Sequence, residues 1–158
     1  MARHLLVPID GSELSKAAVL GAVAFARSLG AAITFFHVQP SFYGRPDLAI
    51  YGEGLVLDPA LNEQFRRANA EFAETILTAA RAQAAEQGVE ADGATTVSPL
   101  IHEAILEAAV QHGCDLIAMA SHGRRGLAGL VLGSETQRVL THATLPVLVL
   151  PARGLDQA

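Results

Sequence analysis

Short apolar runs alternate along this chain with longer stretches of helical pattern, and this alternation limits the possible folds more than any other feature. The apolar runs cover residues 5–9, 32–38, 89–97 (the weakest), 116–120 and 145–150. Helical patterns separate them, at about 13–29, 60–87, 101–112 and 135–142. Most of the runs are apolar on both sides, which is typical of parallel strands covered by helices on both faces. The sequence therefore predicts an α/β fold with a parallel sheet and right-handed crossovers.

The first helical pattern carries signals for its end and for its buried side. Gly30 follows its last apolar residue, as expected just past a helix C-terminus. The spacing of Ala17, Leu20, Ala24 and Leu29 places these residues near one face. We therefore expect this face to pack on the sheet.

Size and composition fit one domain, at residues 1–152, with a short tail at 153–158. A chain of 158 residues buries roughly 70% of its unfolded surface without a disulfide or a metal. The net charge of −5 argues against a nucleic-acid backbone as partner. Cys114 is the single cysteine, and the first apolar run is too short for a signal peptide or a membrane span. We expect a cytoplasmic protein that does not enter membranes.

Residues 120–134 read ASHGRRGLAGLVLGS and lie between an apolar run and a helical pattern. Glycines let a backbone approach a ligand closely, and the free amides at a helix start favour a phosphate. The segment predicts an anion cradle, although a tight connection without a ligand has the same glycine content. It has no lysine of the Walker type, so it is not a P-loop of that kind.

In a parallel sheet of this type, a ligand binds at the carboxyl ends of the strands, where the strand order reverses. Three strand ends are expected there: Pro8-Ile9-Asp10, His37-Val38 and Met119-Ala120-Ser121. The Asp10 carboxylate would accept hydrogen bonds from a ribose or a base. An alternative interpretation makes Asp10 the N-cap of the first helix, and Ser134 is open to the same interpretation at the last helix.

Several of these segments together resemble the universal stress protein family over nearly the whole chain. They are LLVPIDGS at 5–12, His37-Val38, HEAILEAA at 102–109, CDLIAMASHGRRG at 114–126, LGS at 132–134 and LPVLVL at 145–150. Nucleotide-binding members carry G-x2-G-x9-G-(S/T), which falls here on Ala120, Gly123, Gly133 and Ser134. Alanine replaces the first glycine. It costs about 1 kcal/mol or more if that residue needs a positive φ, and it only packs against the nucleotide if the backbone is extended; strand-end geometry favours the second case.

The resemblance implies an open five-stranded parallel sheet of order 3-2-1-4-5 with helices on both faces, of the Rossmann-like, adenine-nucleotide alpha-hydrolase-like type. It implies ATP, with adenine near Asp10 and Val38 and phosphates on the loop from Ser121 to Ser134, and with any Mg²⁺ held by phosphates and water. It implies a homodimer, often through the last strand, Leu145 to Leu150. The expected nucleotide-binding residues are Pro8, Ile9, Asp10, Val38, Met119, Ala120, Ser121, His122, Gly123, Arg124, Arg125, Gly126, Gly133, Ser134, Glu135 and Thr136.

The chain shows no paired carboxylates, no nucleophile with a base and no metal clamp, so we predict no catalytic residue and no protein metal ligand. The first hypothesis is a stress-response module that binds ATP and acts through its dimer on an unknown protein partner. The alternatives are a weak ATPase or nucleotidyl transferase, and an interaction protein without nucleotide. His122 is interpreted as shaping the loop. Arg124 and Arg125 either neutralise a triphosphate or are solvated, and residues 40–59 form either a lid or an excursion.

Overall fold

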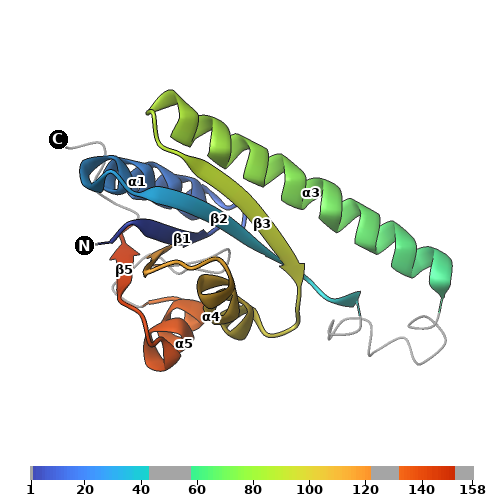
Figure 1. The fold of residues 1–158 in the computed structure, drawn as a ribbon. Coiled ribbons are helices and arrows are strands. Elements are labelled where there is room, and N and C mark those ends of the chain that lie inside the picture. The colour runs from blue at the N-terminus through green and yellow to red at the C-terminus, as the bar shows by residue number, and fades with distance from the viewer. Residues whose placement is uncertain (1, 43–57, 122–131, 152–158) are drawn as a thin grey trace.

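The computed structural model describes residues 2–42, 58–121 and 132–151. Within these residues, parallel strands form a five-stranded sheet in the order β3-β2-β1-β4-β5 (Figure 1). The strands are β1 (His4–Pro8), β2 (Ala32–Gln39), β3 (Ala91–Val97), β4 (Leu116–Ala120) and β5 (Val147–Leu150). The predicted fold class and strand order are confirmed. The strand order reverses between β1 and β4, where the crevice for a ligand is expected.

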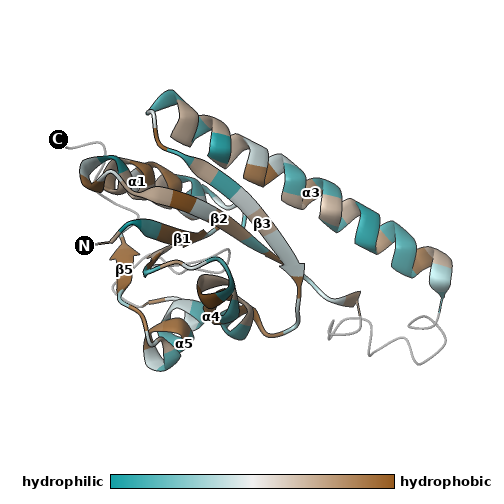
Figure 2. Ribbon diagram, viewed as in Figure 1, coloured by the Kyte–Doolittle hydropathy of each residue, from teal (hydrophilic) through white to brown (hydrophobic). Residues whose placement is uncertain are grey.

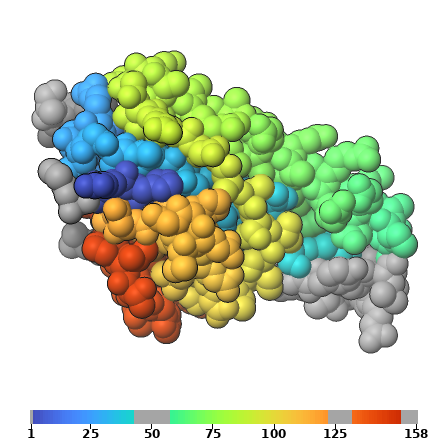
Figure 3. Space-filling view, in the orientation of Figure 1, coloured from blue at the N-terminus to red at the C-terminus, as the bar shows by residue number. Residues whose placement is uncertain are grey.

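Helices cover both faces of this sheet. The helices α1 (Glu13–Leu29) and α3 (Pro59–Glu86) pack on one face, and α4 (Ile101–Gln111) and α5 (Ser134–His142) pack on the other. The long α3 helix extends past the carboxyl end of β3, and much of it is hydrophilic (Figures 1 and 2). In the space-filling view, α4 and α5 form one continuous flank and α3 forms the opposite one (Figure 3). Among the described residues, no helix has the length and apolar character needed to cross a membrane.

Each central strand is buried on both faces, as its sequence predicts. In β1, Leu5 and Val7 belong to the core beneath α1 and α3, whereas Leu6 belongs to the core beneath α4 and α5. Phe35 and Phe36 of β2 divide between the two cores in the same way. This division follows from the alternation of side chains along a strand. The two cores fix the sheet in place and leave its strand ends open.

The α1 helix has the expected bounds but a different buried face. Ser12 caps its N-terminus by accepting a hydrogen bond from the Ser15 amide at 3.1 Å, and Gly30 ends it with a φ of 63°. The residues that face the sheet are Ala18, Val19, Ala22, Val23 and Ala26. The predicted face was wrong, since Leu20 is 49% exposed. Two sets of small apolar residues share the helical spacing in this segment, so periodicity alone does not choose between them.

A carboxylate joins the starts of two neighbouring strands. Asp115, just before β4, accepts hydrogen bonds from the backbone amides of Arg3, at 2.9 and 3.1 Å, and His4, at 3.2 Å. The Arg3 amide is the main reason that the pKa of the Asp115 carboxyl lies below its usual value. This contact aligns β1 with β4 at the end of the sheet opposite the crevice.

Candidate functional site

The turn after β1 is braced by hydrogen bonds around Asp10. One oxygen of the Asp10 carboxylate accepts from the Ser12 amide at 2.9 Å, and the Asp10 amide donates to Ser15 Oγ at 3.1 Å. Gly11 has a φ of 79°. The interpretation of Asp10 as the N-cap of α1 was wrong, because Ser12 holds that position and its hydroxyl accepts the capping bond. Asp10 instead orders the turn at the carboxyl end of β1, where the sequence predicts a ribose or base ligand.

The end of β2 is held by a buried histidine. His37 Nδ1 lies 2.8 Å from the carbonyl oxygen of Ile9, so this nitrogen carries the proton and donates it. The hydroxyl of Thr95, on β3, donates to the His37 carbonyl at 2.8 Å and accepts from the Gln39 side chain at 3.1 Å. The His37 side chain is 6% exposed, so it packs into the interior at the end of β2. Sequence reasoning missed the bond between Gln39 and Thr95, because these two residues lie more than fifty positions apart in the chain.

Both ends of the glycine-rich segment are tied to β4. The Gly133 amide donates to the Ser121 carbonyl at 2.8 Å, and the hydroxyl of Thr136 donates to the Ala120 carbonyl at 3.0 Å. The Ser121 amide donates to the carbonyl of Leu150 on β5 at 3.1 Å. These bonds set the first turn of α5 beside the carboxyl end of β4. The predicted site residues His122, Gly123, Arg124, Arg125 and Gly126 lie outside the described residues.

The α5 helix begins with an N-terminus that no described side chain caps. Gly133 is the N-cap residue and Ser134 is the first helical residue, so the interpretation of Ser134 as the cap was wrong by one position. The first amides of a helix have no partner within the helix and lie at the positive end of its dipole. Because the Gly133 amide already bonds to Ser121, the amides available to an anion are those of Ser134, Glu135 and Thr136.

The Glu135 side chain connects α5 to α4. Its Oε2 accepts from the His102 amide at 3.0 Å, and its Oε1 accepts from Arg138 Nη1 at 3.0 Å. Glu135 thereby caps α4, whose own N-cap residue Leu100 makes no side-chain cap. His102 Nδ1 lies 3.5 Å from Oε2 in a geometry that makes no hydrogen bond, so the two groups form an ion pair only when the imidazole is protonated. The sequence placed Glu135 with the nucleotide, and the structure directs its carboxylate to α4.

The remaining predicted residues sit at strand ends, and the side chains of Ile9, Val38 and Met119 pack into the two cores. Ile9 and Met119 are each 6% exposed, in the cores on opposite faces of the sheet, so what they present to a ligand is mainly backbone. Val38 is partly buried against the core beneath α4 and α5, and Pro8 ends β1. Ala120 lies in β4, and no described residue other than glycine has a positive φ. Alanine is therefore unstrained at this position of the motif.

The described residues hold neither a cation site nor a reactive thiol. They include no group of three or more histidine, cysteine, aspartate or glutamate side chains arranged to bind a metal ion. Burial raises the pKa of the Cys114 thiol to about 11. A thiol of that pKa is protonated at neutral pH and behaves as a small apolar side chain. The chemistry that the described site offers is hydrogen bonding from backbone amides and from the Asp10 turn.

Comparison with known proteins identifies the family. The model of the universal stress protein family matches residues 1–151. The chain belongs to the universal stress protein family. The universal stress protein YxiE of Bacillus subtilis is 33% identical over 152 residues, which cover 94% of this chain and 99% of that protein. The solved structure of universal stress protein UspA from Lactobacillus plantarum has a TM-score of 0.75 and is 27% identical, covering 94% of this chain and 97% of that one.

Two further solved structures of the same fold contain adenine nucleotides. A universal stress protein in complex with cAMP has a TM-score of 0.64 at 22% identity and covers 96% of this chain and 98% of that one. The universal stress protein from Archaeoglobus fulgidus in complex with dAMP has a TM-score of 0.61 at 18% identity, covering 93% of this chain and 96% of that one. At these identities the two structures establish a shared fold with this chain.

Proposed function

We propose that this universal stress protein binds ATP at the crevice between β1 and β4 and acts as a nucleotide-dependent regulatory module in a stress response. The observation that carries the proposal is the start of α5, where a glycine is the N-cap and three amides follow without a described side-chain cap. A polyphosphate supplies the oxygen acceptors that such amides need. The cAMP and dAMP complexes of two proteins with the same fold support an adenine nucleotide as the ligand class.

The two ends of the nucleotide have different partners in this proposal. The phosphates lie on the amides of Ser134, Glu135 and Thr136, and the ribose and adenine lie between the Asp10 turn and the end of β2 near Val38. Mg²⁺ enters with the phosphates, which supply its oxygen ligands together with water.

In this proposal the protein is a cytoplasmic homodimer whose two subunits are joined through an edge of the sheet. β5 (Val147–Leu150) pairs with β4 on one side and is last in the strand order, and all four of its residues are partly exposed. An unpaired edge strand offers a row of backbone donors and acceptors to a second strand. Since Ser121 at the base of the cradle donates to Leu150, the proposed dimer edge and the nucleotide site share a hydrogen bond.

Substitution of Gly133 separates binding from folding. Aspartate is a preferred N-cap residue, and the backbone at Gly133, with φ −60° and ψ 152°, accepts it without strain. Gly133→Asp therefore leaves α5 as stable as before or more so, while its carboxylate occupies the amides and repels phosphate. We expect ATP affinity in isothermal titration calorimetry to fall at least tenfold, with an unchanged or raised melting temperature.

Two control variants isolate the charge and its position. Gly133→Asn keeps a preferred N-cap residue without a charge, and we expect it to lose less affinity than Gly133→Asp. Gly113→Asp places the same charge just before β4, at the other end of the sheet; its φ of 64° lowers stability by about 1 kcal/mol, and it is expected to bind ATP like the parent protein. Wild-type ATP affinity in Gly133→Asp, or equal losses of affinity in Gly133→Asp and Gly113→Asp, would refute the proposed site.

A steady-state turnover assay separates a binding module from an enzyme. Turnover of dozens of ATP molecules per minute would refute a binding module and favour an enzyme.

A further inference from the structure

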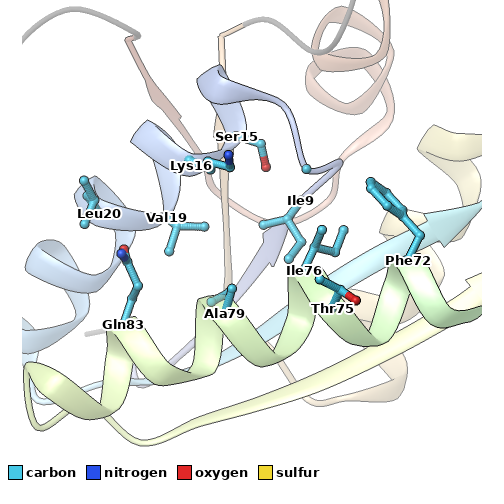
Figure 4. Close-up of a pocket in the computed structure, with 12 residues that line it drawn as sticks. Ile9, Ser15, Lys16, Val19, Leu20, Phe72, Thr75, Ile76, Ala79 and Gln83 are labelled. Carbon is cyan, nitrogen blue, oxygen red and sulfur yellow. The ribbon is translucent and has the colours of Figure 1, made fainter.

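A cavity of about 490 Å³ lies between α1 and α3, on the sheet face opposite α5 (Figure 4). Buried Ile9, Val19 and Ala80 line it, as do the more exposed side chains of Leu20 and Ala79. Sites for small molecules usually measure about 300–1,000 Å³ and are mostly apolar. The volume and lining of this cavity therefore suit a ligand with an apolar body.

Small residues keep this space open along α3. The lining of the cavity runs from Phe72 to Gln83, about 16 Å of helix at about 1.5 Å per residue. Along that stretch, Ala79 and Ala80 present only methyl groups, which leaves Leu20 of α1 49% exposed across from them. The space is thus a long groove with a mostly apolar lining, and a linear molecule would cover Leu20.

Charge at the rim selects the sign of the ligand. Among the described residues, Lys16 is the only charged one that lines the groove, and it is the only lysine in the chain. Its Nζ lies 2.7 Å from Glu13, in a pair whose side chains are 64% and 88% exposed. Exposed pairs of this kind contribute little to stability, so Lys16 is able to exchange Glu13 for another anion. Lys16 also lies in the first turns of α1, where the helix dipole favours negative charge.

We propose that the groove binds an amphipathic monoanion, specifically a straight-chain alkyl carboxylate. The alkyl chain lies between α1 and α3 along Val19 and Ala79, and the carboxylate accepts hydrogen bonds from Lys16 Nζ. Thr75 and Gln83 supply neutral polar groups at the rim of the groove. The groove lies on the sheet face opposite α5, and one end of it, at Ile9 and Gly11, adjoins the Asp10 turn of the proposed nucleotide site.

Calorimetric titration with hexanoate, octanoate, decanoate and dodecanoate, each below its micelle-forming concentration, tests the proposal. We expect one site per chain and an affinity that rises about fourfold for each added methylene, which corresponds to about 0.8 kcal/mol. The rise stops once the chain outgrows the groove. Nonyltrimethylammonium, with the same nine-carbon tail as decanoate and the opposite charge, is expected to bind at least tenfold more weakly than decanoate.

Matched variants locate the binding site. Ala79 is exposed at the rim, so Ala79→Phe fills the groove without disturbing the core, whereas Ala82→Phe adds the same ring to an exposed position of α3 that does not line the groove. We expect Ala79→Phe to abolish decanoate binding and Ala82→Phe to leave it intact, with both melting temperatures close to that of the parent protein. Lys16→Met should weaken decanoate at least fivefold and leave decanol unchanged.

Three results would overturn the proposal. They are the absence of saturable decanoate binding, binding to many sites at once in the manner of a detergent, and undiminished binding to Ala79→Phe. Gly133→Asp, which targets the nucleotide site, is expected to bind decanoate with the affinity of the parent protein. This comparison separates the alkyl carboxylate site from the amides that are proposed to bind the phosphates.

Discussion

Gly11 occupies the tightest position in the turn that carries Asp10, and its replacement by alanine tests how that turn is built. Its φ of 79° is a conformation that L side chains rarely adopt. A Cβ at this position would also lie 2.7 Å from Cζ of Phe72 and 3.1 Å from Cγ2 of Ile76, both on α3. Two separate penalties, backbone strain and overpacking, therefore act on Gly11→Ala.

The size of each penalty follows from these contacts. A left-handed backbone costs a residue with a Cβ about 1–2 kcal/mol, and overpacking costs about 1–3 kcal/mol. A Gly→Ala change also lowers the conformational entropy of the unfolded chain, which stabilises the folded state by about 0.4–1 kcal/mol. The free energy of unfolding should therefore fall by about 1–5 kcal/mol. Part of this is transmitted to the site, because the Phe72 ring packs edge-on to His37 with ring centroids 5.6 Å apart.

Two comparisons separate strain from overpacking in urea unfolding followed by circular dichroism. Gly30 has a φ of 63°, and no atom lies within 4 Å of the place that an alanine methyl would take, so Gly30→Ala measures the strain alone, about 1 kcal/mol. Phe72→Leu removes the ring atom that the new methyl meets. The double variant Gly11→Ala with Phe72→Leu should therefore recover about 1–2 kcal/mol of coupling energy. Equal losses in Gly11→Ala and Gly30→Ala, with no recovery in the double variant, would refute the reasoning.

Three further predictions concern buried and bridging groups. With a pKa of about 11 against an ordinary value of 9.0, the Cys114 thiol should react with iodoacetamide at pH 8 about 100-fold more slowly than in the unfolded chain, as followed by mass spectrometry; a rate within fivefold of the unfolded chain contradicts this. Because the Arg3 amide and its neighbours lower the pKa of the Asp115 carboxyl below 3.8, its stabilisation is present above pH 3.8 and is lost as pH falls through the lower, folded pKa. In urea unfolding, Asp115→Asn should lower the free energy of unfolding by about 1 kcal/mol at pH 7 and leave it unchanged below the folded pKa of Asp115. A loss that persists below that pKa argues against stabilisation by the ionised carboxylate. Glu135→Ala removes the cap of α4 and should lower stability by about 0.5–2 kcal/mol, with Glu135→Gln closer to the parent protein; an unchanged urea midpoint in Glu135→Ala excludes the capping role.

The fold was predictable because its signals are local and repeated. Each buried strand is a short apolar run between helical patterns, and the bounds of α1 and β4 agree with those that the sequence predicts. The edge strand β3 begins at Ala91, two residues later than expected, because its alternating and partly exposed residues give a weaker pattern. The order of the strands was predicted from the family resemblance, since the general rules on chirality and connections limit the possible orders without choosing one.

The site was less predictable because its details depend on contacts between distant residues. Whether Asp10 or Ser12 caps α1 depends on one hydrogen bond, and both residue types suit an N-cap. The bond between Glu135 and the His102 amide spans 33 residues, and no local pattern announces it. The groove between α1 and α3 depends on which face of α1 turns to the sheet, a choice that an alanine-rich helix leaves open.

The central claim is that the first amides of α5 bind the phosphates of an adenine nucleotide, and backbone amide chemical shifts measure this directly. In a titration of the isotope-labelled protein with ATP, the account predicts the largest saturable shifts at Ser134, Glu135 and Thr136, with smaller ones at Asp10. Gly133→Asp should abolish them at the same ATP concentration. Saturable ATP binding that leaves these three amides unmoved would contradict the account.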